Sequence, residues 1–146
     1  GPDLNLNPVA TVLYPEPLKE KDIEAVIKAI PKREVMAKKV EKETYMTSMG
    51  YIERAAFLNS LPKTVNGLAA YAVFDALTNG SGDFASPADM DDKLADWRAN
   101  GLGGFKDSLF RAQAGKLSAY ATFAFLIFIV LDLIAESSYN GWLSGP

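Results

Sequence analysis

The side chains that most often carry enzyme chemistry are missing from this chain. Its 146 residues include no histidine and no cysteine. Without histidine there is no Ser–His triad and no histidine-bound metal, and the commonest general base near neutral pH is lost. Without cysteine there is no disulfide, no thiolate nucleophile and no zinc–thiolate site. Any chemistry here would depend on carboxylates, amides and hydroxyl groups.

Five aspartates gather in the stretch 83–96, at Asp83, Asp89, Asp91, Asp92 and Asp96. A calcium loop of the EF-hand type needs acids at alternate positions, a central glycine and a glutamate at position 12, and this stretch lacks that pattern. Acids in the first turn of a helix are favoured by its dipole, which explains them more simply. The glycine-rich pieces 80–82 and 101–104 match neither a P-loop nor a dinucleotide fingerprint. We therefore expect no enzyme activity.

Asp132 and Glu136 form the most informative ionisable pair. Their i, i+4 spacing places both on one face of a helix. Asp132 is also the single charge in the run 117–135, which holds 19 residues. An acid inside a membrane is costly and usually marks a partner or ligand. The sequence leaves two interpretations open: both side chains reach water, or they contact a cation of another subunit or ligate a pigment metal.

The run 117–135, LSAYATFAFLIFIVLDLIA, is the element that would position this pair. As a helix it would be roughly 28 Å long, close to the ~30 Å hydrocarbon core of a bilayer. Its apolar residues cover every direction around the helix, which is typical of a buried core helix or a membrane span. The rest of the chain is too small and too charged to enclose it, so we predict a single transmembrane helix.

The flanks of this run predict its orientation. Lys106, Arg111 and Lys116 precede it, and no lysine or arginine follows it. Positive charge near one end predicts that the N-terminal side faces the cytoplasm or its equivalent. Tyr120 near one boundary, with Tyr139 and Trp142 beyond the other, are typical of membrane interfaces.

Several short helices are predicted before the span. Ile23, Val26, Ile27 and Ile30 recur with helical spacing in 18–30, between Pro17 and Pro31. Further helices are predicted over 32–48 (with Val35, Met36 and Val40 apolar), 51–61, 63–79 and 86–100. The segment 63–79 reads as the core helix or as a helix in the membrane interface, with Asp75 among its inward-facing candidates.

For 86–100 we expect a capping box at Ser86 to Asp89, with Met90, Leu94 and Trp97 on one face. Residues 101–105 read as a hinge, and 106–116 lead into the span.

The N-terminal residues 1–17 contain four prolines and no helical periodicity. They are predicted to form an extended arm, whose Leu13 and Tyr14 pack on their own domain or contact a partner. Gly1-Pro2 reads either as a processed end or as a remnant of protease cleavage. The predicted fold class is all-α, with an arm at 1–17, a helical soluble-side region at 18–105 and a membrane anchor with a short tail at 106–146. No strand is apparent.

The charge of the chain argues against a nucleic-acid partner. Its net charge is −3, and no basic block is interleaved with aromatic residues. Lys38, Lys39, Glu41, Lys42 and Glu43 make 32–48 highly charged, which indicates a solvated helix face or a contact with anionic lipid or an acidic partner.

The overall plan resembles a known family of membrane subunits. An extended N-terminus, a helical soluble part and one span ending AESSYNGWLSGP are similar to the small accessory subunits of photosystem–antenna supercomplexes in algae with red-derived plastids. More narrowly, the plan resembles the cryptophyte-type linker between chlorophyll a/c antenna proteins and a photosystem core. The antenna proteins themselves have three spans and a Glu-x-x-Asn-x-Arg motif, and this chain has neither.

The resemblance implies a chloroplast thylakoid location, a stromal N-terminal side, and chlorophyll and carotenoid nearby. Because histidine is absent, a chlorophyll magnesium would need another ligand, for which Glu136, Asn140 and Gln113 are the candidates. Partner contacts are expected at Phe125, Phe128, Asp132, Tyr139 and Trp142. The expected function is a non-enzymatic linker of antenna proteins to a photosystem core, in contact with lipid. The alternatives are an accessory or assembly subunit of a respiratory or other membrane complex, and a membrane-anchored enzyme.

Overall fold

The computed structural model describes residues 18–37, 45–78, 80 and 82–143 of the chain. The predicted contacts at Leu13 and Tyr14, and the charged stretch 38–43 with Val40, lie outside these residues. The chain divides into two compact units, Gly1–Gly115 and Lys116–Pro146. The fold is all-α, as predicted, and one long apolar helix lies at its C-terminal end.

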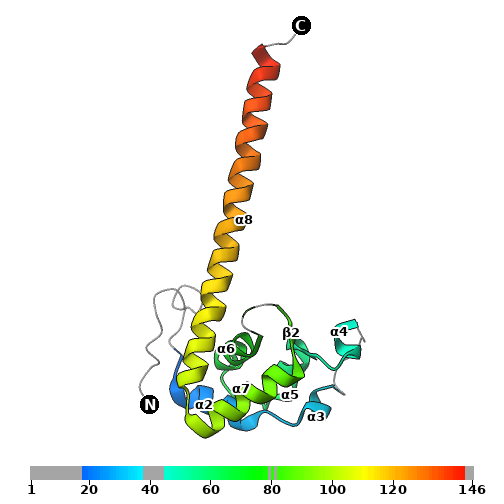
Figure 1. Ribbon diagram of the computed structural model, residues 1–146, viewed down its shortest axis with the longest axis vertical. Coiled ribbons are helices and arrows are strands. Elements are labelled where there is room, and N and C mark those ends of the chain that lie inside the picture. The colour runs from blue at the N-terminus through cyan, green and yellow to red at the C-terminus, as the bar shows by residue number, and fades with distance from the viewer. Residues whose placement is uncertain (1–17, 38–44, 79, 81, 144–146) are drawn as a thin grey trace. The chain divides into compact units, whose positions relative to one another are not determined.

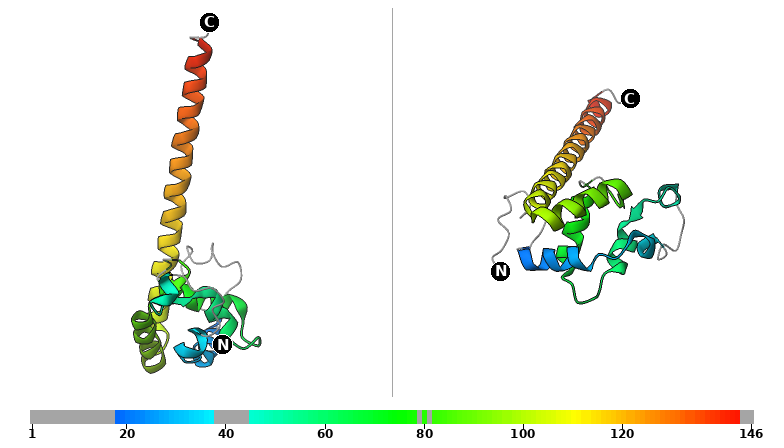
Figure 2. Two further views of the ribbon diagram at one scale, coloured as in Figure 1. Left: turned by 90° about the vertical axis from the view of Figure 1, so that its right-hand side faces the viewer. Right: turned by 60° about the horizontal axis from the view of Figure 1, so that its bottom comes forward.

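The first unit is built around α6, Gly67–Thr78. Its other elements are α2 (Glu20–Ala29), α3 (Arg33–Ala37), α4 (Tyr45–Ser48), α5 (Arg54–Ser60) and α7 (Pro87–Asn100). Helices α2, α5 and α7 all contact α6 (Figures 1 and 2). Every residue of α6 from Ala72 to Thr78 is buried. Of the two interpretations of segment 63–79, a core helix or a helix in the membrane interface, the structure shows the core helix.

Aromatic pairs fill the core of this unit. The ring centres of Phe57 and Phe74 lie 5.0 Å apart, and the rings of Trp97 and Phe105 are nearly perpendicular with their centres 5.3 Å apart. The amphipathic predictions are confirmed for α2 and α7, because Ile23, Val26, Ile27 and Ile30 are buried, as are Met90, Leu94 and Trp97. Each helix buries its apolar stripe and leaves its charged side chains near solvent.

One predicted helix of the first unit starts later in the structure, and a strand pair is present that was not predicted. The predicted helix 51–61 begins only at Arg54, because Ile52–Glu53 form strand β1. This strand pairs antiparallel with β2, Phe84–Ala85, although no strand was apparent from the sequence. Strands of two residues carry no alternating pattern, so only the long-range pairing reveals them. Within the predicted helix 32–48, the structure describes α3 and α4 and leaves residues 38–44 undescribed; Met36 is buried and Val35 is exposed.

Two further predictions, one for each end of α7, were wrong: the capping box and the extent of the hinge. Ser86 is the N-cap residue and Pro87 follows it, but the Ser86 side chain makes no capping hydrogen bond. The predicted hinge 101–105 ends early, because α8 begins at Gly103. Gly101 does reverse the chain, with φ of 82°, whereas Phe105 is already buried beside Trp97. Helix α8 therefore begins within the glycine-rich stretch and places Phe105 in the core.

Helix α8 runs without a break from Gly103 to Leu143 (Figure 1). The continuity of 106–116 with the apolar run is therefore confirmed. Leu109, Ala112 and Gln113 are buried in the first unit, so that unit extends to Gly115, later than the predicted boundary at 105. The second unit contains the remainder of α8.

Candidate functional site

The part of α8 in the second unit is long and apolar enough to cross a membrane. None of its most apolar 18-residue window is buried, and it is the single helix of this kind among the described residues. Phe123, Phe125 and Phe128 are between 63% and 69% exposed. Aromatic rings exposed to this extent are unfavourable in water, and lipid or neighbouring membrane helices would cover them.

Most of the predicted partner and ligand residues in this unit lie along one face of α8. Successive helical residues are offset by about 100°, so Phe125, Phe128, Glu136 and Tyr139 all lie within about 40° of Asp132. Ser118 and Ala121 share the same direction. We call the set Ser118, Ala121, Phe125, Phe128, Asp132, Glu136 and Tyr139 the acid-bearing face. All of its members are exposed.

The opposite face of the same helix has a different composition. It carries Phe123, Ile127, Val130 and Ile134, which point away from Asp132 by about 140° or more. These four side chains are apolar, large and exposed. A surface of this composition suits contact with lipid chains. The two faces of α8 therefore differ in composition. The sequence analysis did not recognise this difference, because apolar residues occur in every direction around the helix.

The three predicted pigment ligands have different surroundings. Glu136 lies on the acid-bearing face, where its carboxylate is exposed. Gln113 is fully buried in the first unit, and its Nε2 donates to Asp75 Oδ2 at 3.3 Å. This burial argues against Gln113 as a ligand of an external pigment. Asn140 and Trp142 belong to the last turns of α8, and their side chains fall outside what the structure describes.

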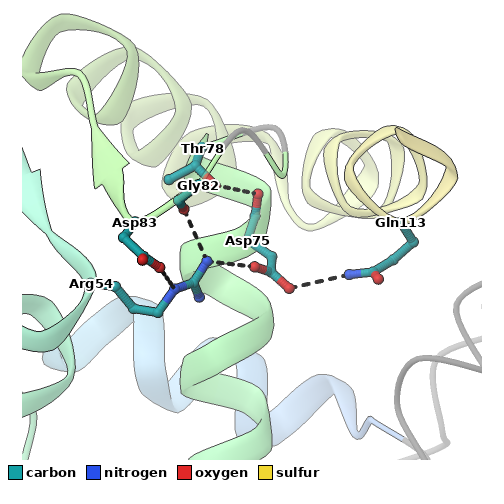
Figure 3. Close-up of polar contacts among 6 residues, drawn as sticks. All are labelled: Arg54, Asp75, Thr78, Gly82, Asp83 and Gln113. Atoms are coloured by element: carbon teal, nitrogen blue, oxygen red, sulfur yellow. Dashed lines mark hydrogen bonds and ion pairs between the residues drawn. The ribbon is translucent and has the colours of Figure 1, made fainter. Parts of the chain in front are cut away.

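The first unit contains a buried polar cluster centred on Arg54 (Figure 3). Arg54 Nη2 donates to Asp75 Oδ1 at 2.8 Å and to the Gly82 carbonyl at 3.2 Å. Arg54 Nε donates to Asp83 Oδ1 at 3.2 Å. The guanidinium also lies 4.3 Å from the ring centre of Tyr71 and 4.7 Å from that of Phe74. The Asp75 side chain is fully buried, and that of Arg54 is 11% exposed.

This cluster connects segments that are far apart in the sequence. Arg54 begins α5, Asp75 and Thr78 belong to α6, Gly82 and Asp83 precede β2, and Gln113 lies on α8. The backbone repeats the connection, since Arg54 N–H donates to the Asp83 carbonyl at 2.7 Å. The role of this arrangement is structural, because it joins the start of α5 to α6, to the segment before β2 and to α8.

Burial of only one member of this cluster was expected from the sequence. Asp75 is the single charge in α6, and it was among the residues expected to face inward. Arg54 sits in a segment with ordinary composition and was missed. A lone acid in an apolar helix requires a cation or hydrogen-bond donors when it is buried, so Asp75 itself indicated that such a partner exists.

Three of the five aspartates in 83–96 form ion pairs or hydrogen bonds with other side chains. Asp83 and Asp91 form ion pairs with Arg54 and Arg33, and Asp96 accepts from Asn100. Among the described residues, no group of three or more carboxylates could hold a metal ion. Within the same stretch, Lys93 Nζ donates to the Ala76 carbonyl at 2.9 Å. Burial lowers the pKa of Lys93 below 10.5, while Asp89 raises it and Arg111 lowers it further.

Comparison of this chain with protein-family models, curated proteins and solved structures found no match.

Proposed function

We propose that this chain is a non-enzymatic, single-span membrane subunit that joins other membrane proteins. The observation that supports the proposal is the apolar stretch of α8, of which nothing is buried in the most apolar 18-residue window. Exposed rings and branched side chains of this number need a non-aqueous environment. The first unit, with its own aromatic core, then serves as a soluble-side domain attached to the anchor.

The resemblance of the overall plan gives the proposal a specific form. In that form the chain links chlorophyll-binding antenna proteins to a photosystem core in the thylakoid membrane, with lipid, chlorophyll and carotenoid as neighbours. Among the predicted pigment ligands, Glu136 has a carboxylate that is exposed on α8. In this form of the proposal, Glu136 is the ligand of the central magnesium of a chlorophyll. Contacts through both the span and the soluble domain would reinforce each other by high effective concentration.

The first test is membrane integration of the native chain. We expect it to stay with the membrane after carbonate washing and to move with a pigmented complex on a detergent gradient. Release by carbonate would contradict the proposed span. Migration with an unpigmented complex would contradict the photosystem form and favour an accessory subunit of another membrane complex.

The second test compares the two faces of α8. Replacing Phe125 and Phe128 with alanine removes two rings from the acid-bearing face, and replacing Phe123 and Ile134 removes a similar apolar area from the opposite face. Because aromatic rings bury large areas at interfaces, we expect the first pair to lower the antenna-to-core ratio of purified complexes and the second to leave it near wild type. An unchanged ratio with core photochemistry lost would instead show that the chain serves the reaction itself.

A further inference from the structure

We propose that the acid-bearing face binds a membrane helix of a different protein, and that this helix carries a lysine or arginine at the depth of Asp132. The inference rests on the proposed function, because it requires α8 to cross the bilayer. It deepens that function by naming the face that is used and the chemistry of its partner.

The position of Asp132 is the first step of the argument. Leu131 and Leu133 are its neighbours, and Ile134 follows within the same turn. Among the described residues no hydrogen bond or ion pair reaches Asp132 or Glu136, and both are exposed. A carboxylate among aliphatic side chains in a bilayer is unfavourable unless a cation, a donor or water meets it. The short aspartate side chain also reaches less far toward the interface than lysine or arginine does.

Helix α8 itself does not supply the cation. Its basic residue nearest to Asp132 is Lys116, which precedes Asp132 by about 24 Å along the helix. A second copy of α8 inserted in the same direction would place acid against acid, since it lacks basic residues at that depth. Charge complementarity therefore selects a different protein.

The shape of the acid-bearing face agrees with a helix as the occupant. Ser118 and Ala121 are small, and small residues let two membrane helices approach closely. Phe125 and Phe128 follow on the same side, and the two acids come one turn apart after them. The opposite face offers Phe123, Val130 and Ile134, without an acid, and suits lipid.

The absence of native cysteine makes a direct test possible, because each introduced cysteine is unique. Single variants at Ser118, Phe125 and Phe128 report on the acid-bearing face, and variants at Phe123, Val130 and Ile134 report on the opposite face. With a thiol-linked photocrosslinker in the native complex, we expect crosslinks to another subunit from the first set. Fluorophores on the second set should be quenched by brominated lipid. Crosslinks mainly from the second set, or to a second copy of this chain, would overturn the proposal.

Charge is tested separately with Asp132→Asn, Glu136→Gln and the double variant. We expect the amount of partner subunit retained in detergent to fall by about three- to twentyfold, the range of strong interhelical polar contacts. Asp132→Glu should restore most of it, and Asp132→Lys should remove the partner. Asp107→Asn, which neutralises an exposed acid in the first unit, is the matched control. If Asp132→Asn behaves like that control, the proposed cation contact is wrong. Carbonate release of the wild type would instead refute the span on which it rests.

Discussion

At the scale of single residues, the ion pair between Arg54 and Asp75 is the most demanding feature of the first unit. A buried pair of charges loses hydration, and its attraction offsets that loss only when other hydrogen bonds complete it. Here the Gly82 carbonyl, Asp83 and Gln113 provide such bonds, whereas Arg54 Nη1 is buried without a hydrogen-bond partner among the described residues. The rings of Tyr71 and Phe74 also contact the guanidinium, which favours a cation at this position.

Replacement of Asp75 by asparagine should destabilise the first unit by about 3 kcal/mol or more, since it leaves the Arg54 charge buried without its main partner. Asp83→Asn is the control, because that carboxylate is 75% exposed and should contribute less than about 1 kcal/mol. Urea unfolding followed by Trp97 fluorescence, with Trp142 replaced by phenylalanine and the full chain in detergent, measures both. Equal losses for the two variants would show that burial of Asp75 does not govern the pair.

At the scale of elements, the close contact between the end of α6 and α8 depends on a glycine. Gly80 has φ of 72°, and its N–H donates to the Asp75 carbonyl at 3.0 Å. A Cβ atom at this position would lie 2.7 Å from the Ala112 carbonyl oxygen. Backbone atoms cannot move aside as a flexible side chain can, so the contact admits only glycine without displacement of α8.

We therefore expect Gly80→Ala to cost about 2 kcal/mol or more, through a left-handed backbone conformation and an overlap with Ala112. Gly50→Ala is the matched control: Gly50 has φ of 87°, and an added Cβ would only reach Pro87 Cγ at 3.8 Å. It should lose about 1 kcal/mol from the backbone term alone. The same urea assay measures both, and a loss at Gly80 no larger than at Gly50 would contradict the close approach.

Lys93 connects α7 to the last carbonyls of α6, and this contact predicts a pH dependence. Burial lowers the pKa of Lys93 in the folded chain below 10.5, so the unfolded chain binds more protons between the two values. Burial of the charged lysine should thus lower the free energy of unfolding at neutral pH. This free energy should rise as the pH increases through the folded pKa towards 10.5. Urea titrations across this alkaline range should show the rise in wild type and in Lys63→Met, whose lysine is exposed. Lys93→Met should lack this component, and an identical slope in all three would refute it.

At the scale of the whole molecule, α8 carries two kinds of contact along one helix. Up to Gly115 its buried side chains belong to the core of the first unit, and from Lys116 on its exposed apolar side chains suit a membrane. Lys106, Arg111 and Lys116 all lie on α8 before the apolar run. The positive charge therefore lies at one end of the apolar run only, and this difference would set the orientation of the helix in a bilayer.

This asymmetry predicts that residues 1–105 face the cytoplasm or stroma. Cysteines introduced at Lys63 and at Ser138 are each unique and lie in different units. In sealed membranes of known orientation, an impermeant maleimide added to the cytoplasmic or stromal side should label the variant at Lys63 and not the variant at Ser138. The reverse pattern would invert the topology, and labelling of both would argue against a span.

The features that the sequence determined are those set by neighbouring residues. The apolar run of α8 matches the thickness of a bilayer through consecutive side chains, and the stripes of α2 and α7 follow from helical periodicity. The placement of Asp132 and Glu136 on one face of α8 follows from the same helical periodicity. None of these depends on the position of a distant segment, so each could be predicted before the fold was known.

The tertiary structure decided what depends on segments brought together from afar. Arg54 meets Asp83 and Asp75 across 29 and 21 positions, and Asp75 meets Gln113 across 38. The β1–β2 pair and the contact of Gly80 with Ala112 are of the same kind. No local pattern encodes such contacts, because the free energy of a buried charge or a close backbone approach is set by the partner that the fold supplies. For this reason Gln113 was predicted to be a pigment ligand, whereas the fold buries it beside Asp75.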